Sequence, residues 1–499
     1  MKAPNVIDIG SRRELFVDDH LIADKSDGAR LLLHKPTPRE VVLATDEPWE
    51  GNMSGYITLF RDEARVRMYY KAWQLDLERG SGDDDDPGEP HPLWVCYAES
   101  DNGLIWHKPE LGLIEYQGSG ANNIVWQGAG AEQHGVHGFS PFKDTNPNAA
   151  PAARYKAVGG DRRATHGHLY AVASPDGIHW SLLQEEPILY QDVHGAFDSQ
   201  NLAFWDTVHD EYRIYIRDFH RHDGGRGMRD IKTATSPDFL HWTDPLWLDY
   251  GDSPHEQLYT NQVQPYYRAP HIYVGFPTRY VEREWGPAIE HLPEPEHRRR
   301  RASFNERYGT ALTEGLFMSS RDGRTFERWG EAFIPPGPQL EGNWAYGDNY
   351  QCRGMFETPS SLSGAPSELS FLVEEGAWRG KGKRLRRYST RIDGFVSLHG
   401  PRSGATMTTE PLTFQGDALT LNVATSAAGS ARVEIREASG EPIDGFSLDD
   451  CYEIIGDELE RTVRWRQGAH VGGLAGRPVR LHFVLCDTDL YAMRFVERT

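Results

Sequence analysis

Acidic side chains stand shortly before several aromatic segments of this chain. Glu50, Asp198 and Glu256 each precede, by a few residues, a run whose composition is typical of a strand. Carboxyl groups that meet in one site can do acid–base chemistry, because one can stay protonated while its neighbour is ionised. The chain contains 74 acidic residues, so a surface or capping role competes with a chemical role for each of them. The deciding question is which elements could bring three such distant acids together.

A recurring turn motif indicates those elements. Its clearest copy is Ser174-Pro175-Asp176-Gly177-Ile178-His179-Trp180, and five copies or looser variants contain Asp101, Asp176, Asp238, Asp322 and Asp393. Asp and Gly favour tight turns, since the Asp side chain caps backbone donors and Gly adopts a positive φ without strain. These five aspartates are 62 to 84 residues apart, with strand-like runs between them. A repeat of this length is typical of the four-stranded blades of a β-propeller. We therefore predict an all-β fold with a five-bladed β-propeller over residues 1–400.

The periodicity stops after Asp393. Short alternating segments separated by Gly-containing turns then predict a β-sandwich over residues 401–499. Residues 14–19 are expected to supply a closing strand to the propeller. A charged insertion at about 282–307 contains Arg298-Arg299-Arg300-Arg301. We expect these arginines to lie in a solvated loop, with pairing to carboxylates or a position over the site as the alternatives.

Composition excludes several classes of partner. The formal net charge is −21, which argues against nucleic acid or an anionic membrane surface. No signal-like or membrane-spanning segment is evident, so a cytoplasmic location is expected. The four cysteines lack metal-ligand spacing, and no phosphate-binding or dinucleotide-binding motif is present, so we expect no metal and no cofactor. The oligomeric state is left open.

In a propeller, the starts of the innermost strands converge at one face. Glu50, Asp198, Glu256 and Asp348 occupy such positions in the first, third, fourth and fifth blades. These acids are therefore the candidates for a shared site.

The chain resembles the five-bladed propeller glycoside hydrolases of families 43 and 32, and more closely a bacterial family-32-like branch. The features that carry the resemblance are Trp49-Glu50-Gly51, the repeated turn motif, Phe197-Asp198, Glu256 and the trailing sandwich. The resemblance implies that Glu50 acts as base or nucleophile, that Asp198 orients and tunes, and that Glu256 is the general acid.

Two departures from the families' pattern affect these roles. The families' first carboxylate is an Asp, often in Asn-Asp-Pro, whereas this chain has Glu50. Arg217-Asp218-Phe219 matches only the first two residues of their Arg-Asp-Pro, which makes Asp218 an alternative to Asp198.

A sugar site also needs flat apolar faces and partners for hydroxyl groups. The expected stacking and hydroxyl-binding residues are Trp49, His137, Gln200, Asn201, Tyr259, Asn261, Arg279, Trp344, Tyr346, Asp348 and Asn349.

The predicted function is cleavage of a glycosidic bond in a short oligosaccharide or glycoside by carboxylate acid–base catalysis. A glycoside phosphorylase is the nearest alternative, with Arg217, Arg221 and Arg279 as conceivable phosphate ligands. A non-catalytic carbohydrate-binding propeller is the alternative from another class.

Overall fold

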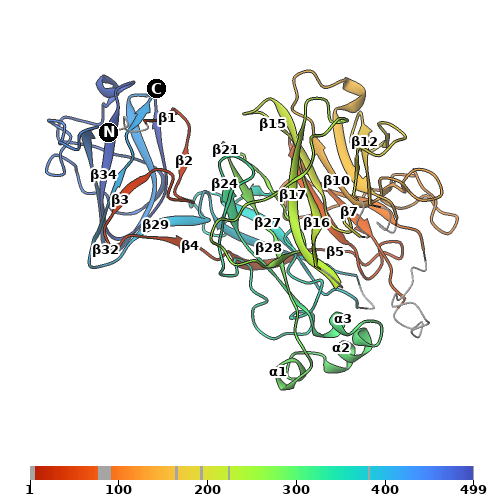
Figure 1. The fold of residues 1–499 in the computed structure, drawn as a ribbon. Helices are drawn as coiled ribbons and strands as arrows, with labels where there is room; N and C mark the ends of the chain where they lie inside the picture. The colour runs from red at the N-terminus through yellow and green to blue at the C-terminus, as the bar shows by residue number, and fades with distance from the viewer. Residues whose placement is uncertain are drawn as a thin grey trace.

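The computed structural model describes residues 6–76, 91–162, 167–191, 195–222, 225–379 and 382–497. Its regular structure is almost entirely β, as the sequence predicts (Figure 1). Short helices α1 (Pro287–Glu290), α2 (Pro295–Ala302) and α3 (Glu306–Thr310) fall inside the charged insertion. No helix in the described ranges is long and apolar enough to cross a membrane.

Five antiparallel sheets follow one another along the chain. Sheet I contains β6 (Gly55–Asp62), β7 (Arg65–Ala72), β8 (Trp94–Ser100) and β9 (Ile124–Trp126). Sheet II contains β10 (His137–Lys143), β11 (Tyr155–Gly160), β12 (His168–Ser174), β13 (Ser181–Leu182) and β14 (Leu189–Tyr190). Sheet III contains β15 (Leu202–Asp206), β16 (Glu211–His222), β17 (Gly225–Ser236) and β18 (Leu246–Trp247).

Sheets IV and V complete the series. Sheet IV contains β20 (Gln264–Tyr266), β21 (Ala269–Gly275), β24 (Met318–Ser320) and β25 (Phe326–Arg328). Sheet V contains β26 (Phe356–Thr358), β27 (Glu368–Glu375), β28 (Arg384–Arg391) and β5 (Thr37–Ala44). A separate small sheet is formed by β19 (Gln257–Leu258), β22 (Thr278–Val281) and β23 (Leu312–Gly315).

The strand that completes sheet V comes from the N-terminal part of the chain. β5 pairs antiparallel with β28, from Thr37 opposite Ser389 to Ala44 opposite Arg384. The expectation that residues 14–19 supply this strand is wrong, because Glu14 and Leu15 form β2 and pair with β34 in another sheet.

The first strands of the sheets lie close together. β10 contacts β6 and β15. Arg353, just before β26, is buried and donates hydrogen bonds to the carbonyl oxygens of Pro141 in β10 and Ala203 in β15. One guanidinium group thus joins segments of sheets II, III and V.

A ten-stranded sheet lies beside the other five in Figure 1, where blue and red segments intermingle. Its strands are β1 (Ile7–Gly10), β2 (Glu14–Leu15), β3 (Ile22–Lys25), β4 (Arg30–Leu33), β29 (Val396–Gly400), β30 (Ala405–Thr409), β31 (Leu412–Phe414), β32 (Ala418–Glu437), β33 (Asp457–Thr462) and β34 (Val479–Val496). The pairing therefore differs from the expected division at residue 400, since both ends of the chain share one sheet. Their apolar side chains build a separate core, in which Trp465 and Phe483 are fully buried.

The repeated motif forms the same turn in sheets I to IV, between the third and fourth strands. In sheet II, the Ser174 hydroxyl accepts from the Gly177 amide at 2.8 Å, and Asp176 Oδ1 accepts from the two amides that follow. In sheet I, Asn102 rather than Asp101 takes the position of that aspartate. The motif is therefore a local structural element.

The fifth copy differs for a topological reason. The fourth strand of sheet V is β5, so the chain after β28 leaves for the ten-stranded sheet. Asp393 there has a left-handed backbone and accepts a hydrogen bond from Tyr266 at 2.7 Å. The expectation of five equivalent turns is thus correct for four of them.

Candidate active site

A cavity with an empty volume of about 660 Å³ opens where the sheets converge. Its described lining includes Gly55 and Tyr56 at the start of β6, Asp198 before β15 and Tyr259 before β20. These positions lie at the starts of first strands, where the sequence places a shared site. Other lining residues come from the ends of second strands and from α3.

Seven of the 16 described lining residues are aromatic. They are Tyr56, Trp73, Tyr259, Tyr308, Tyr346, Tyr350 and Trp378. The Tyr308 and Tyr346 rings stack, with an interplanar angle of 2°. Tyr56 has a left-handed backbone, with φ of 52°, a strained conformation that is often found where a side chain serves a site. Flat apolar faces of this kind suit the rings of sugars.

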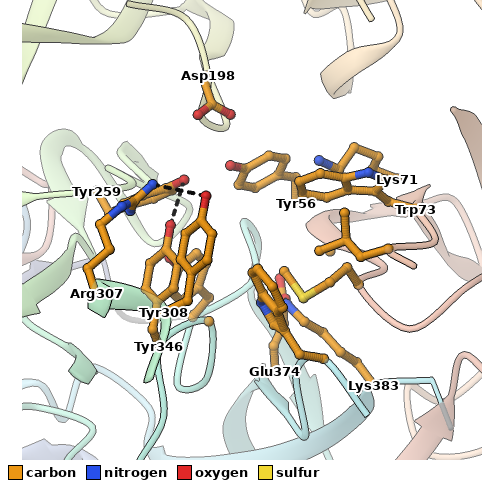
Figure 2. A pocket seen from close by; sticks show the side chains of 16 residues that line it. Tyr56, Lys71, Trp73, Asp198, Tyr259, Arg307, Tyr308, Tyr346, Glu374 and Lys383 are labelled. Carbon is orange, nitrogen blue, oxygen red and sulfur yellow. Dashed lines mark hydrogen bonds and ion pairs between the residues drawn. The ribbon is translucent and has the colours of Figure 1, made fainter. Parts of the chain in front are cut away.

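Two carboxylates line the cavity from different sheets. Figure 2 shows Asp198 apart from Glu374 and Lys383, with Tyr56 between them in this view. Asp198 lies before β15, and 44% of its side chain is exposed. Glu374, in β27, is buried and forms an ion pair with Lys383.

The surroundings of Asp198 favour its ionised form. Burial would raise its pKa, but the hydrogen bond and charge of His137, then the charges of Arg217 and Lys71, hold the pKa below its ordinary value. His137 Nε2 lies 3.1 Å from Asp198 Oδ1, and Arg217 Nη2 lies 3.9 Å from Oδ2. Asp198 is therefore an accessible carboxylate at neutral pH.

The surroundings of Glu374 act in the opposite direction. Burial raises its pKa and outweighs the charges of Lys383 and Lys71 and the bond from Lys383. The two cavity acids thus have pKa values moved apart, which is the arrangement that separates a proton donor from a base.

The tyrosine wall carries positive charge. Burial would raise the pKa of Tyr346, but the charges of Arg307 and Arg229 and a hydrogen bond with Tyr259 lower it. The Tyr346 and Tyr259 hydroxyl oxygens are 3.3 Å apart. The Arg307 guanidinium carbon lies 4.5 Å from the centre of the Tyr308 ring.

The insertion that carries Arg307 is a built part of the site. Arg298 and Arg301 of α2 are buried and donate to the carbonyl oxygens of Trp344 and Tyr346. The expectation of a solvated loop for the four arginines is therefore wrong for these two, because they hold the segment that positions Tyr346. Arg299 and Arg300 are exposed.

Glu50 and Glu256 are not among the described residues that line the cavity. Glu50 is fully buried, accepts a hydrogen bond from Tyr70 and pairs with Lys108 at 2.7 Å. Burial raises its pKa despite Lys108. Glu256 forms ion pairs with Arg279, at 2.6 Å, and with Arg328.

The alternative acids take other places. Asp218 pairs with Lys232 at 2.7 Å and does not belong to the described lining. Asp348 is fully buried next to the lining residue Gly347 and accepts a hydrogen bond from the Ala377 amide at 2.9 Å. Burial raises the pKa of Asp348 to about 6.

None of the predicted polar sugar ligands is among the described residues that line the cavity. His137 touches Asp198, as described, and its ring packs against Tyr56 with centres 5.6 Å apart. Gln200 donates to Thr58 Oγ1 at 2.9 Å, and Asn261 donates to the Gln200 carbonyl at 3.3 Å. Asn201 accepts from the Arg217 amide at 3.0 Å.

The remaining predicted ligands point elsewhere. Trp49 donates to Asn123 at 2.7 Å, and Trp344 donates to the Gly337 carbonyl at 2.8 Å. Arg279 is shared between Glu256 and Glu314. Of the predicted aromatic ligands, Tyr259 and Tyr346 line the cavity.

The prediction missed Lys71, Glu374 and Arg307. Lys71 and Glu374 lie at the ends of the second strands β7 and β27, after runs of buried apolar residues. A charged residue at the end of such a run was the available signal, because buried charges usually serve a partner or a ligand. In the described part of the chain, no group of three or more His, Cys, Asp or Glu side chains could hold a metal ion.

No family model matches the chain, and no curated protein matches it. Solved structures match it at low identity. A glycoside hydrolase is 14% identical, covering 72% of this chain and 92% of its own, with a TM-score of 0.43. An N-acetylgalactosamine deacetylase from F. plautii, in complex with blood group B trisaccharide, is 12% identical, covering 79% of this chain and 96% of its own, with a TM-score of 0.43. A fructofuranosidase from Schwanniomyces occidentalis is 11% identical, covering 96% of this chain and 100% of its own, with a TM-score of 0.38. Glycoside hydrolases are thus among the solved structures to which this chain is similar at low identity.

Proposed function

We propose that this chain is a glycoside hydrolase that cleaves a glycosidic bond in the aromatic cavity. In this proposal, sheets I to V are the five blades of a propeller, and the ten-stranded sheet belongs to an accompanying β-sandwich. The observation that carries the proposal is the pair Asp198 and Glu374, two carboxylates that line one cavity and whose pKa values are moved in opposite directions.

Asp198 supplies the ionised carboxylate. Its exposed side chain can reach a ligand, while His137 and Arg217 hold its charge in place. Such a carboxylate either attacks the anomeric carbon or removes a proton from an attacking water molecule. The separation of the two carboxyl groups in a substrate complex would decide between these routes.

Glu374 supplies the proton. Its raised pKa keeps a larger share of the carboxyl protonated, and the proton passes to the glycosidic oxygen as the bond to the anomeric carbon breaks. The aromatic wall binds the sugar ring by its apolar face.

Glu50 and Glu256 have structural roles in this proposal. Neither is among the described residues that line the cavity, and each pairs with basic side chains. Removing either charge would leave those bases without their partner, and would leave the cavity acids unchanged.

A panel of aryl glycosides and short oligosaccharides tests the proposal with wild type, Asp198→Asn and Glu256→Gln. We expect wild type to cleave at least one compound. Asp198→Asn should lower kcat about 1,000-fold or more, since the reacting carboxylate is lost. The kcat of Glu256→Gln should stay within about threefold of the wild-type value, because the Glu256 carboxylate does not reach the substrate.

Two results would overturn the proposal. If Asp198→Asn keeps the wild-type rate, the cavity assignment is wrong. If wild type binds sugars but cleaves none of them, the non-catalytic carbohydrate-binding alternative replaces the hydrolase.

A further inference from the structure

The cavity contains a positive charge that no carboxylate of the described chain neutralises. Arg307 lines the cavity from α3, and its Nε and Nη1 atoms are buried without a hydrogen-bond partner in the described ranges. Its Nη2 donates to the Tyr308 hydroxyl at 3.3 Å, which is a long contact. A guanidinium group has five donors, so most of its binding capacity is unused.

The two carboxylates of the lining have basic side chains beside them. Asp198 faces His137 and Arg217, and Glu374 faces Lys383. The carboxylates of the cavity are therefore matched without Arg307.

A second guanidinium group lies behind the same wall. Arg229 is 6% exposed, and its guanidinium carbon lies 4.5 Å from the centre of the Tyr280 ring and 5.4 Å from that of Tyr259. Its Nη1 donates to Gln257 at 2.6 Å, while its buried Nε has no hydrogen-bond partner within the described segments. Both arginines thus add positive potential to the tyrosine wall.

This concentration of positive charge is opposite to the net charge of −21 of the whole chain. Buried charges are costly unless they are paired, and an arginine fork pairs best with a planar or tetrahedral oxyanion through two parallel hydrogen bonds. We propose that the substrate of this cavity brings an oxyanion, which Arg307 binds. That the bound oxyanion belongs to a substrate rests on the glycoside hydrolase proposed above, whereas the oxyanion site itself does not.

The oxyanion has two possible sources. It can be an acidic substituent of the sugar, such as the carboxylate of a hexuronic acid. It can also be inorganic phosphate that replaces water as the attacking group. In that reaction a phosphate oxygen bonds to the anomeric carbon, the bond to the glycosidic oxygen breaks, Glu374 protonates the leaving group, and a sugar 1-phosphate forms.

Besides binding an oxyanion, Arg307 can act on the site through Tyr346, and an experiment must separate the two roles. Its charge, together with that of Arg229, lowers the pKa of Tyr346. An arginine that acts only through Tyr346 would influence neutral and acidic ligands alike. An arginine that contacts an oxyanion would influence the acidic ligand alone.

Calorimetric binding to the full chain distinguishes these roles. The probes are glucuronate, galacturonate and inorganic phosphate, with glucose and galactose as neutral counterparts. The variants are Arg307→Gln, Arg307→Lys and, as a matched control on the same insertion, the exposed Arg299→Gln. Thermal unfolding of each variant checks that it is folded.

We expect at least one oxyanion probe to bind, and a bound uronate to bind at least about tenfold more tightly than its neutral counterpart. Arg307→Gln should raise the Kd of that probe by about tenfold to 100-fold, as expected for the loss of a buried charge partner. Arg307→Lys should recover part of the loss, because it keeps the charge and loses the fork. Arg299→Gln should behave as wild type.

Binding of phosphate alone would identify phosphate as the source, and binding of a uronate would identify the sugar. If Arg307→Gln weakens neutral and acidic ligands equally, or if no oxyanion binds, the inference is wrong. If either of these results is obtained and wild type still cleaves neutral glycosides, the hydrolase proposal stays intact. Oxyanion binding that depends on Arg307, without cleavage of any glycoside, would uphold the site and reject the hydrolase.

Discussion

The repeated turns and the cavity use polar residues in contrasting ways. In the turn of sheet II, Ser174 and Asp176 satisfy amides within five residues of themselves, and the Gly177 carbonyl accepts from Tyr69 of sheet I at 2.8 Å. In the cavity wall, buried donors such as Trp73 Nε1 and Trp378 Nε1 have no hydrogen-bond partner in the described structure. Locally satisfied groups stabilise a fold, whereas groups left unsatisfied at a shared cavity are available to a ligand. Substitutions in the turns should therefore change stability alone, and substitutions in the cavity should mainly change activity.

A large loss of activity, comparable with that of Asp198→Asn, is expected for Glu374→Gln. Loss of the proton donor should lower kcat by about 100-fold to 10,000-fold on glycosides with poor leaving groups. On a 4-nitrophenyl glycoside, whose leaving group needs little protonation, the kcat of Glu374→Gln should fall by about tenfold or less. Steady-state kinetics on both substrates measure this difference.

The neighbouring Glu375 provides the control for Glu374→Gln. Glu375 pairs with Arg386 at 2.6 Å and is not part of the described lining. Glu375→Gln should therefore keep wild-type activity on both substrates. An equal loss of Glu374→Gln activity on both substrates would contradict the role of Glu374 as proton donor.

The pH dependence of kcat/KM should show both cavity acids. Asp198 must be ionised, and its lowered pKa keeps it so until the pH falls well below the usual range for aspartate. Glu374 must be protonated, and its raised pKa moves the loss of activity to higher pH. Activity should therefore fall on both sides of a window between the two pKa values.

Asp198→Asn and Glu374→Gln should each change one limb of that profile. The residual activity of Glu374→Gln should lose its alkaline limb, and that of Asp198→Asn its acidic limb. A profile that keeps both limbs in both variants would show that other groups titrate.

Gly177→Ala should separate the turn from the cavity. Gly177 has a φ of +80°, and an added Cβ would lie 2.5 Å from Arg67 Nη1 and 2.8 Å from the Tyr69 hydroxyl. We expect a loss of about 1–3 kcal/mol in the free energy of unfolding, with kcat/KM unchanged. Chemical denaturation and steady-state kinetics measure the two quantities.

Gly112→Ala is the matched substitution. Gly112 has a φ of +68° with nothing near an added Cβ, so it reports backbone strain without the clash. Gly112→Ala should therefore lower the free energy of unfolding by less than Gly177→Ala. A fall in kcat/KM for Gly177→Ala would break the contrast between turn and cavity.

A smaller effect is expected from Asp348→Asn. Burial raises the pKa of Asp348 to about 6, so between about pH 4 and pH 6 the folded state binds more protons than the unfolded state, and stability falls as pH rises. Above pH 6 the variant, which cannot ionise, should be more stable than wild type by about 1–2 kcal/mol. Below about pH 4 the gain should vanish.

The turn aspartate provides the opposite case. Bonds from the His179 and Ile178 amides and from the His179 and Ser174 side chains outweigh burial and lower the pKa of Asp176. Asp176→Asn should therefore lose stability near neutral pH, and the loss should shrink as the pH falls through the usual aspartate range. Denaturation curves at several pH values measure both substitutions. If Asp348→Asn and Asp176→Asn changed the free energy of unfolding in the same direction near neutral pH, the contrast between the two aspartates would be wrong.

The turns could be predicted from sequence because their hydrogen bonds are local. Ser followed two residues later by Asp or Asn specifies the turn, and four copies adopt it. The all-β class and the starts of the first strands at Asp198 and Tyr259 follow from the same pattern.

The pairing of the chain ends and most of the cavity chemistry could not be predicted in this way. β2 and β5 are short segments whose partners lie hundreds of residues away, so nothing local selects them. Glu374, Lys71 and Arg307 meet only through tertiary packing. Glu50 and Glu256 satisfy the same positional rule as Asp198, but of the three only Asp198 belongs to the described lining of the cavity.

A crystal structure of Asp198→Asn with a bound substrate from the glycoside panel would test the central claim most directly. The account predicts that the sugar lies in the aromatic cavity, with its anomeric carbon facing position 198 and its glycosidic oxygen within hydrogen-bonding distance of Glu374. A sugar bound instead against Glu50 or Glu256, with Glu374 out of reach of the glycosidic oxygen, would contradict it.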